Sequence, residues 1–90
     1  MSEFRFAVNV LPKDGILDPQ GRAVEGSLGH LGIEGVSAVR VGRRVELTVE
    51  ANDEADARVT VERLAGELFS NPLIESFAIE WVDIHPAAVR

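Results

Sequence analysis

The chain contains no cysteine. This absence excludes disulfide bonds, thiolate metal sites and a cysteine nucleophile on this chain. The two histidines do not form a metal site in place of cysteine. Neither His30 nor His85 has a second ligand at helical or hairpin spacing, so the sequence predicts no metal site.

Basic residues are few, with 9 Lys and Arg against 15 Asp and Glu and a formal net charge of −6. Nucleic-acid backbones select basic faces, and no basic stripe runs along this chain. The cluster of Arg40, Arg43 and Arg44 is typical of charges that flank a turn. We therefore expect no nucleic-acid partner.

Long apolar runs are also missing, since no segment approaches the roughly 20 residues of a membrane span. The N-terminus lacks a basic stretch followed by an apolar run, so we expect a cytoplasmic protein without membrane contact. Ninety residues predict one domain, which we place at 1–84, followed by a short tail at 85–90. A domain this small is marginally stable alone, which favours oligomerisation.

Alternation of apolar and polar residues predicts strands at 4–10, 36–41 and 45–51, the last two forming a hairpin around Gly42 and Arg43. Apolar residues at helical spacing predict helices at 19–31 and from Asn52 or Asp53 to 70. With a last strand at 73–84, the order is βαββαβ. This order predicts a ferredoxin-like α+β fold, an antiparallel sheet with two helices on one face.

The last strand is largely apolar on both faces. One face carries Phe77, Ile79 and Trp81, and the other carries Ala78, Val82 and Ile84. A single-layer antiparallel sheet normally leaves one face wet, so we expect a second copy of the chain to cover the other. The prediction is a homodimer or a dimer of dimers.

Asp18 and Pro19 strongly predict the start of a helix. An aspartate at the N-cap accepts hydrogen bonds from the free N–H groups of the first turn, and the N–H that proline lacks at the first helical position would have had no partner in the helix. Gly21 is unexpected in the next turn, where it costs about 1 kcal/mol relative to alanine. We predict that it leaves space for a neighbouring chain. The Asp18 carboxylate competes for the N–H groups that a phosphate would need, which disfavours an anion site.

The sequence gives little support for a nucleotide-binding or catalytic site. Gly26, Gly29 and Gly32 lie inside or at the end of a helix and not before one, so they do not form a dinucleotide-binding loop. No serine lies in a nucleophile elbow. An acylphosphatase site could use only Arg22 and Asn9, and the position of Arg22 within a helix is unsuitable.

Three stretches of the chain resemble the PurS family, the small subunit of phosphoribosylformylglycinamidine synthase. They are Gly15-Ile16-Leu17-Asp18-Pro19-Gln20-Gly21 with Ala23-Val24, then Leu31-Gly32 with Gly35-Val36 and Val39-Arg40-Val41-Gly42, and Asn71-Pro72-Leu73-Ile74-Glu75 with Phe77 and Ile79-Glu80. The first is the most specific. Arg43 and Phe77 depart from the family pattern, where lysine and tyrosine are common.

The resemblance implies a non-catalytic subunit that bridges a glutaminase subunit and a large synthetase subunit, with ATP and Mg²⁺ on the large subunit and no cofactor on this chain. The absence of a cysteine nucleophile agrees with this division. The expected partner interface comprises Asp18, Pro19, Gln20, Gly21, Arg40, Asn71, Pro72 and Trp81. Two alternatives remain open: a ferredoxin-like regulatory dimer that binds a small metabolite, and an independent acylphosphatase-like enzyme.

Overall fold

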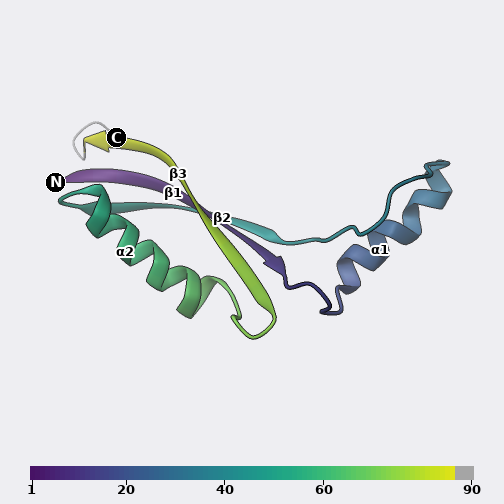
Figure 1. Cartoon of the computed structure of the whole chain (residues 1–90). Helices are drawn as coiled ribbons and strands as arrows, with labels where there is room; N and C mark the ends of the chain where they lie inside the picture. Colours follow the sequence, from purple (N-terminus) through teal and green to yellow (C-terminus); the bar gives the residue numbers. More distant parts are fainter. Residues whose placement is uncertain (87–90) are drawn as a thin grey trace.

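The computed structural model describes residues 1–86, and side chains for 1–82. Its elements are β1 (Ser2–Pro12), α1 (Pro19–Leu28), the 3-10 turn η1 (Gly29–Leu31), β2 (Arg43–Ala51), α2 (Glu54–Leu64), the π-helical turn η2 (Ala65–Phe69) and β3 (Glu75–Pro86). The α+β class expected from the sequence is confirmed, with three strands where four were predicted (Figure 1).

The sheet is antiparallel and has the order β2-β1-β3, so the first strand is central. In this register Val8 lies opposite Val45 on one side and Ile79 on the other. A bulge interrupts the pairing of β1 with β3 between Arg5 and Phe6. The alternation of apolar and polar residues that predicted β1 thus reflects side chains that point in turn to the two faces of the sheet.

One face of β1 forms the core with α2. The buried side chains are Phe4, Phe6, Val8 and Val10 from β1, Ala51 from β2, and Ala57, Val61 and Ala65 from the helix. The three helical residues recur every four positions, so they form one stripe against the sheet. Asp53 caps α2 as predicted, accepting from the Asp56 N–H at 2.8 Å.

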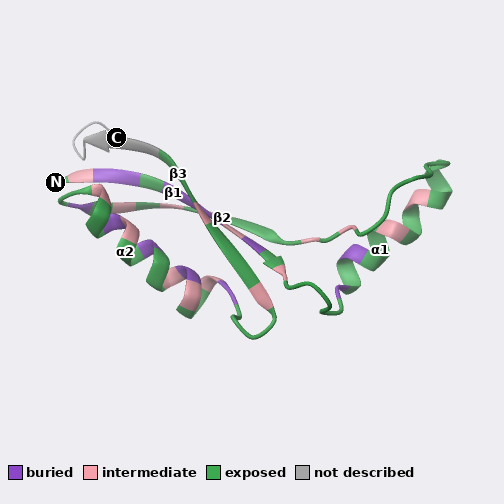
Figure 2. Cartoon of the chain, in the orientation of Figure 1, coloured by how far each residue is buried: buried purple, intermediate pink, exposed green. Residues whose placement is uncertain are grey.

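α1 does not pack on the sheet. It projects beyond the end of the strands, and the chain then runs back along it to β2; we call residues 13–42 the arm (Figure 1). The radius of gyration is 17.1 Å, whereas a compact chain of this length has about 12 Å. The expectation of two helices on one face is therefore wrong for this chain, because only α2 covers the sheet. Figure 2 shows that most of the arm is exposed.

The predicted strand at 36–41 is not formed either. Its backbone finds partners on α1 and not on a strand: the Val39 N–H donates to Glu25 Oε2 at 2.9 Å, and the Arg22 guanidinium donates to the Val39 carbonyl at 3.1 Å. Ala38 has a φ of 57°, which interrupts an extended backbone. Alternation alone does not distinguish such a segment from a strand.

The last strand differs from its prediction at both ends and on one face. β3 includes His85 and Pro86, paired with Glu3 and Ser2, so the strand continues two residues beyond the predicted end at 84; residues 87–90 of the expected tail lie outside the described residues. The face opposite α2 carries Glu80, which binds Arg44 Nη1 at 2.7 Å. The expectation that both faces are apolar is therefore wrong on that side.

Among the described residues, no helix has the length and apolar character needed to cross a bilayer.

Candidate functional site

A groove lies where the arm joins the sheet. It is lined by Leu17, Pro19 and Gln20 from the start of α1, by Gly42 and Arg43 from the start of β2, and by Ile74 from the loop before β3. We call it the base groove. A backbone hydrogen bond from the Lys13 N–H to the Ile74 carbonyl, at 2.9 Å, joins its two walls. The groove thus combines segments that are far apart in the sequence.

Asp18 holds the arm in place. One carboxylate oxygen accepts from the Gly21 N–H at 3.1 Å, as predicted for an N-cap, and the other accepts from the Val41 N–H at 2.9 Å. Both bonds favour the charged form and lower the pKa of this buried carboxyl, the Val41 bond most strongly. The same side chain therefore starts α1 and fixes the returning segment against it.

Gly21 is required by the chain itself. A Cβ on this residue would collide with the Val39 carbonyl and with the Asp18 carboxylate. The space is thus taken by the returning segment, and the prediction that it accommodates a neighbouring chain is wrong. Gly42 has a similar function at the other end of the segment, where a Cβ would collide with the Val10 carbonyl.

Arg40 secures the same junction from the outside. Its guanidinium donates to the Pro12 carbonyl at 3.1 Å and lies 3.4 Å from Asp14. These contacts join the returning segment to the end of β1 and to the loop that follows it. Because Arg40 and Asp14 are exposed, this pair contributes little to stability and mainly orients the loop.

Arg43 and Glu75 form the other wall of the base groove. Two parallel bonds of 2.8 and 2.9 Å join the guanidinium to the carboxylate, and Arg43 also donates to the Phe69 carbonyl at 2.5 Å. The Asn71 N–H donates to Glu75 at 2.7 Å. Arg43 first, and then the Asn71 N–H, lower the pKa of Glu75 to about 2.

Asn71 and Pro72 belong to the turn that this pair holds. The Asn71 side chain accepts from the Leu73 N–H at 3.2 Å, and its carbonyl accepts from the N–H groups of Ile74 and Glu75. The asparagine is therefore used inside the turn. The turn leaves Leu73 strongly exposed beside the base groove.

The structure brings most of the predicted interface residues together. Asp18, Pro19, Gln20, Gly21, Arg40, Asn71 and Pro72 lie in or beside the base groove. Trp81 lies elsewhere, opposite Phe6 on the sheet face that carries α2. Sequence reasoning missed Arg43 and Glu75, whose pairing across 32 residues leaves no local signal.

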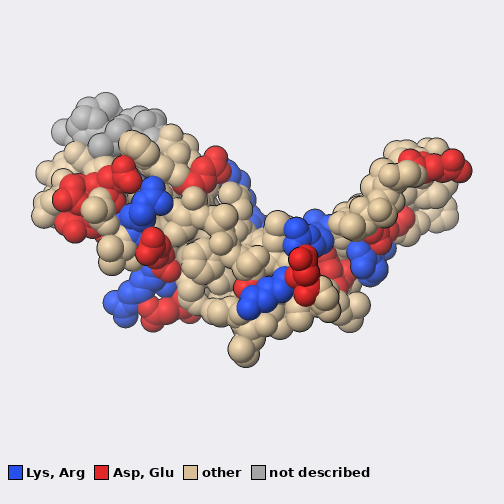
Figure 3. Space-filling model, viewed as in Figure 1, with Lys and Arg blue, Asp and Glu red and all other residues tan. Residues whose placement is uncertain are grey.

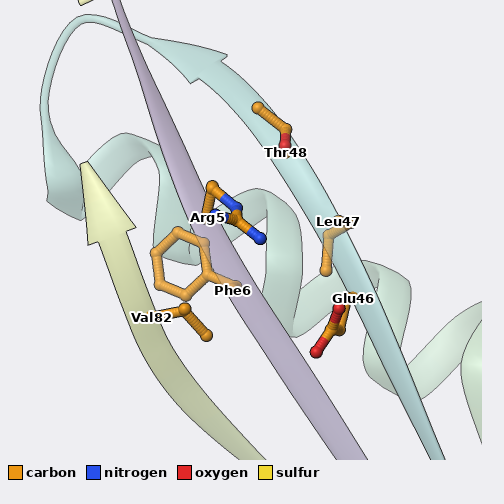
Figure 4. A pocket seen from close by; sticks show the side chains of 6 residues that line it. All are labelled: Arg5, Phe6, Glu46, Leu47, Thr48 and Val82. Atoms are coloured by element: carbon orange, nitrogen blue, oxygen red, sulfur yellow. The ribbon is translucent and has the colours of Figure 1, made fainter. Parts of the chain in front are cut away.

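A second hollow lies on the sheet (Figure 4). Its lining side chains come from all three strands: Arg5, Phe6, Glu46, Leu47, Thr48 and Val82. Its lining contains no histidine, and the hydroxyl of Thr48 therefore has no imidazole base beside it in this hollow. Across the described residues, no group of three His, Asp or Glu side chains is placed to hold a metal ion.

Charges are mixed over the molecule. On the face shown in Figure 3, basic and acidic side chains lie among one another, and no basic stripe is visible there. Arg44 illustrates the pattern, because it binds Glu46 at 3.0 Å and Glu80 at 2.7 Å. This face has no surface suited to a nucleic-acid backbone.

Residues 5–83 match the family model described as PurS, phosphoribosylformylglycinamidine (FGAM) synthase. The chain belongs to the PurS family. It is 43% identical over 75 residues to the PurS subunit of Mycobacterium leprae, covering 83% of this chain and 91% of that protein. It is 41% identical over 73 residues to the subunit of Synechocystis sp., covering 81% and 73%.

Solved PurS structures have the same fold. A chain of the structure described as PurLQS from Thermotoga maritima superposes with a TM-score of 0.83 at 29% identity, covering 91% of this chain and all of that one. The arm of this PurS chain lies within the matched residues. The α+β fold class and the family predicted from the sequence are therefore both confirmed.

Replacing the Asp18 carboxylate tests its function in the arm. We expect Asp18→Ala to cost about 1 kcal/mol locally and to speed amide hydrogen exchange at Gly21 and Val41 roughly fivefold. Amides of β1 should not change. Asp53→Ala removes the other N-cap and is the matched control: it should affect α2 alone. Unchanged exchange at Val41 would contradict the assignment.

The Arg43–Glu75 pair predicts a response to acid. The pKa of Glu75 is about 2 in the folded chain against an ordinary value of 4.5, so its stabilising effect is complete above about pH 4.5 and is lost as the pH falls through 2. Carboxyl carbon NMR of Glu75 should titrate near pH 2. In Arg43→Gln the midpoint should move toward 4.5, and equal midpoints in both proteins would exclude this pairing in solution.

Proposed function

We propose that this chain is the small, non-catalytic subunit of a phosphoribosylformylglycinamidine synthase and that it bridges the glutaminase and synthetase subunits. The single observation that carries the proposal is the family match over residues 5–83. The likeness to a chain of the PurLQS structure from Thermotoga maritima supports the association with two other subunits. The synthase is a ligase of purine biosynthesis, and we therefore expect this chain to be located in the cytoplasm.

The side chains of this subunit support a non-catalytic function. Release of ammonia from glutamine by this class of glutaminase requires a cysteine nucleophile, and the chain has none. The acidic groups that line the base groove, Asp18 and Glu75, are held by hydrogen bonds within the fold. We assign glutamine hydrolysis to the glutaminase subunit and ATP with Mg²⁺ to the synthetase subunit.

Bridging has a chemical purpose in this reaction. The synthetase activates the formyl amide oxygen of formylglycinamide ribonucleotide with ATP, and ammonia displaces it to give the amidine. Ammonia released into water would be protonated and lost as a nucleophile. A subunit that keeps the two sites in contact shields the transfer from water.

The base groove is our proposed contact with a partner subunit. Arg43 and Glu75 are paired with each other, and Asp18 accepts from backbone N–H groups. What the groove offers is therefore apolar surface, with Leu17 strongly exposed in its lining and Leu73 strongly exposed next to Ile74. Gln20 adds a polar side chain at the start of α1. Such a surface suits a protein interface better than a small polar metabolite, which favours the bridging function over the regulatory alternative.

Reconstitution tests the proposed function. Combined with the cognate glutaminase and synthetase, the chain should be required for glutamine-dependent amidine formation. It should be needed far less when ammonium salts supply the nitrogen, because the synthetase site is then served from solution. An equal loss of both activities on omission of the chain would contradict bridging.

A charge in the base groove should weaken the assembly. Leu17→Glu places a carboxylate on an exposed apolar position, so the fold should be retained while association with the partners falls tenfold or more, since a buried unpaired charge is costly. The measurement is the concentration of the chain that gives half-maximal glutamine-dependent activity. Val59→Glu, on the outer side of α2, is the control and should behave as the native chain; equal behaviour of the two variants would exclude the groove as a contact.

A further inference from the structure

The sheet face opposite α2 is polar, and several of its charges are paired. Arg44 binds Glu80 at 2.7 Å and Glu46 at 3.0 Å. Asn9 joins the same network, accepting from Arg44 at 3.3 Å and donating to Glu80 at 3.5 Å. The network therefore links all three strands of the sheet.

Arg5 is the exception on this face. It lies on the central strand β1, and its direct neighbour on β2 is Thr48, so the two side chains share the open face. Among the described side chains, neither the Arg5 guanidinium nor the Thr48 hydroxyl has a hydrogen bond or an ion pair. A guanidinium carries five N–H donors, and those of Arg5 remain available at the surface.

A bulge lies beside Arg5. Arg5 is opposite Asp83 on β3 and Phe6 is opposite Trp81, so Val82 has no partner on β1. The extra residue of a bulge interrupts the ladder and bends the strand. Val82 is 43% exposed at this point.

Val82 lines the hollow of Figure 4, which we call the sheet hollow. The lining combines a cation, a carboxylate, a hydroxyl and an apolar side chain: Arg5, Glu46, Thr48 and Val82. In Figure 4 Arg5 extends from β1 toward β2, between Thr48 and Glu46. The volume is about 240 Å³, below the roughly 300–1,000 Å³ of sites for drug-sized molecules. The sheet hollow therefore suits a ligand of few atoms.

The sheet hollow presents two opposite charges that do not neutralise each other. Glu46 lies two residues along β2 from Thr48 and is thus diagonal to Arg5, and such neighbours are about 7–8 Å apart. Within the described side chains the Glu46 carboxylate binds Arg44 through Oε2 only, and it forms no ion pair with Arg5. A ligand with both a carboxylate and an ammonium group meets both charges, whereas a simple anion is repelled by Glu46.

We propose that the sheet hollow binds a free α-amino acid with an uncharged side chain. The ligand carboxylate accepts from the Arg5 guanidinium, in the two-bond geometry that arginine favours, and from the Thr48 hydroxyl. The ligand ammonium group donates to Glu46, and the ligand side chain packs against Val82. The site is formed by the sheet of one chain, so the inference goes beyond the proposed function and requires no partner subunit.

Glutamine is the first ligand to test, because the proposed function makes it the nitrogen donor of the synthase. Its amide is uncharged, whereas glutamate, the product of its hydrolysis, brings a second carboxylate close to Glu46. We expect glutamine to bind at millimolar concentration, as a small ligand at an exposed site does, and glutamate to bind about threefold more weakly.

Titration of the ¹⁵N-labelled native chain with glutamine measures this binding. Saturable shifts should be confined to amides around the sheet hollow, including those of Arg5, Thr48 and Val82. Two analogues separate the charges of the ligand: N-acetylglutamine lacks the ammonium group, and the α-amide of glutamine lacks the carboxylate. Each should bind about tenfold more weakly than glutamine. Shifts that do not saturate, or equal binding of the three compounds, would overturn the proposal.

Variants assign the two charges to their residues. Arg5→Gln should weaken glutamine binding about tenfold and keep the native circular dichroism, because Arg5 is exposed. Glu46→Gln should weaken the binding of glutamine but not that of N-acetylglutamine, which lacks the group that Glu46 contacts; a purely structural effect would weaken both. Arg63→Gln removes an exposed arginine from α2 and is the control with native affinity. Native affinity of Arg5→Gln would refute the site and leave the bridging function, which reconstitution tests separately, unaffected.

Discussion

The hydrogen bonds of the Asp18 carboxylate determine the shape of this molecule. One oxygen starts α1 through Gly21, and the other fixes the returning segment through Val41. The Val41 bond adds to the bonds of Val39 with Arg22 and Glu25, which hold the same segment against the helix. Among the side chains that hold the returning segment, Asp18 also caps α1, and it is itself buried.

The glycines and arginines around this carboxylate support the same arrangement. Gly21 and Gly42 allow two backbone contacts that a Cβ would prevent. Arg40 and Arg43 then bind the arm's end to the loop after β1 and the turn before β3. The most specific stretch of the family resemblance, from Leu17 to Gly21, is therefore explained by the folding of the arm before any partner is considered.

Local signals in the sequence predicted what is locally determined. The alternation in β1 and β2 and the caps at Asp18 and Asp53 follow from contacts within a few residues. The segment at 36–41 has the composition of a strand, yet its partners are the Glu25 and Asp18 side chains, and no periodicity specifies such a choice. The position of α1 away from the sheet could not be predicted from the sequence pattern either. An amphipathic pattern predicts that a helix has an apolar face, but it does not identify the surface against which that face packs.

The same reasoning explains why the candidate site was found in part. Asp18, Pro19, Gln20 and Asn71 lie in the stretches that carry the family resemblance, so the sequence indicates them. Arg43 and Glu75 were missed because their importance lies in a contact between distant segments. Trp81, an expected interface residue, is 48% exposed and lies on the face of β3 that also carries α2.

Polar and apolar side chains have different functions in this structure. The ionised side chains at the base of the arm are paired with groups of the same chain, and these pairs set its geometry. The apolar side chains of the arm and of β3 are left exposed, as a chain of this size with a helix away from its sheet cannot bury them alone. Because apolar burial is the main source of association energy and is non-directional, the polar contacts must supply the specificity of the assembly by fixing where that surface points.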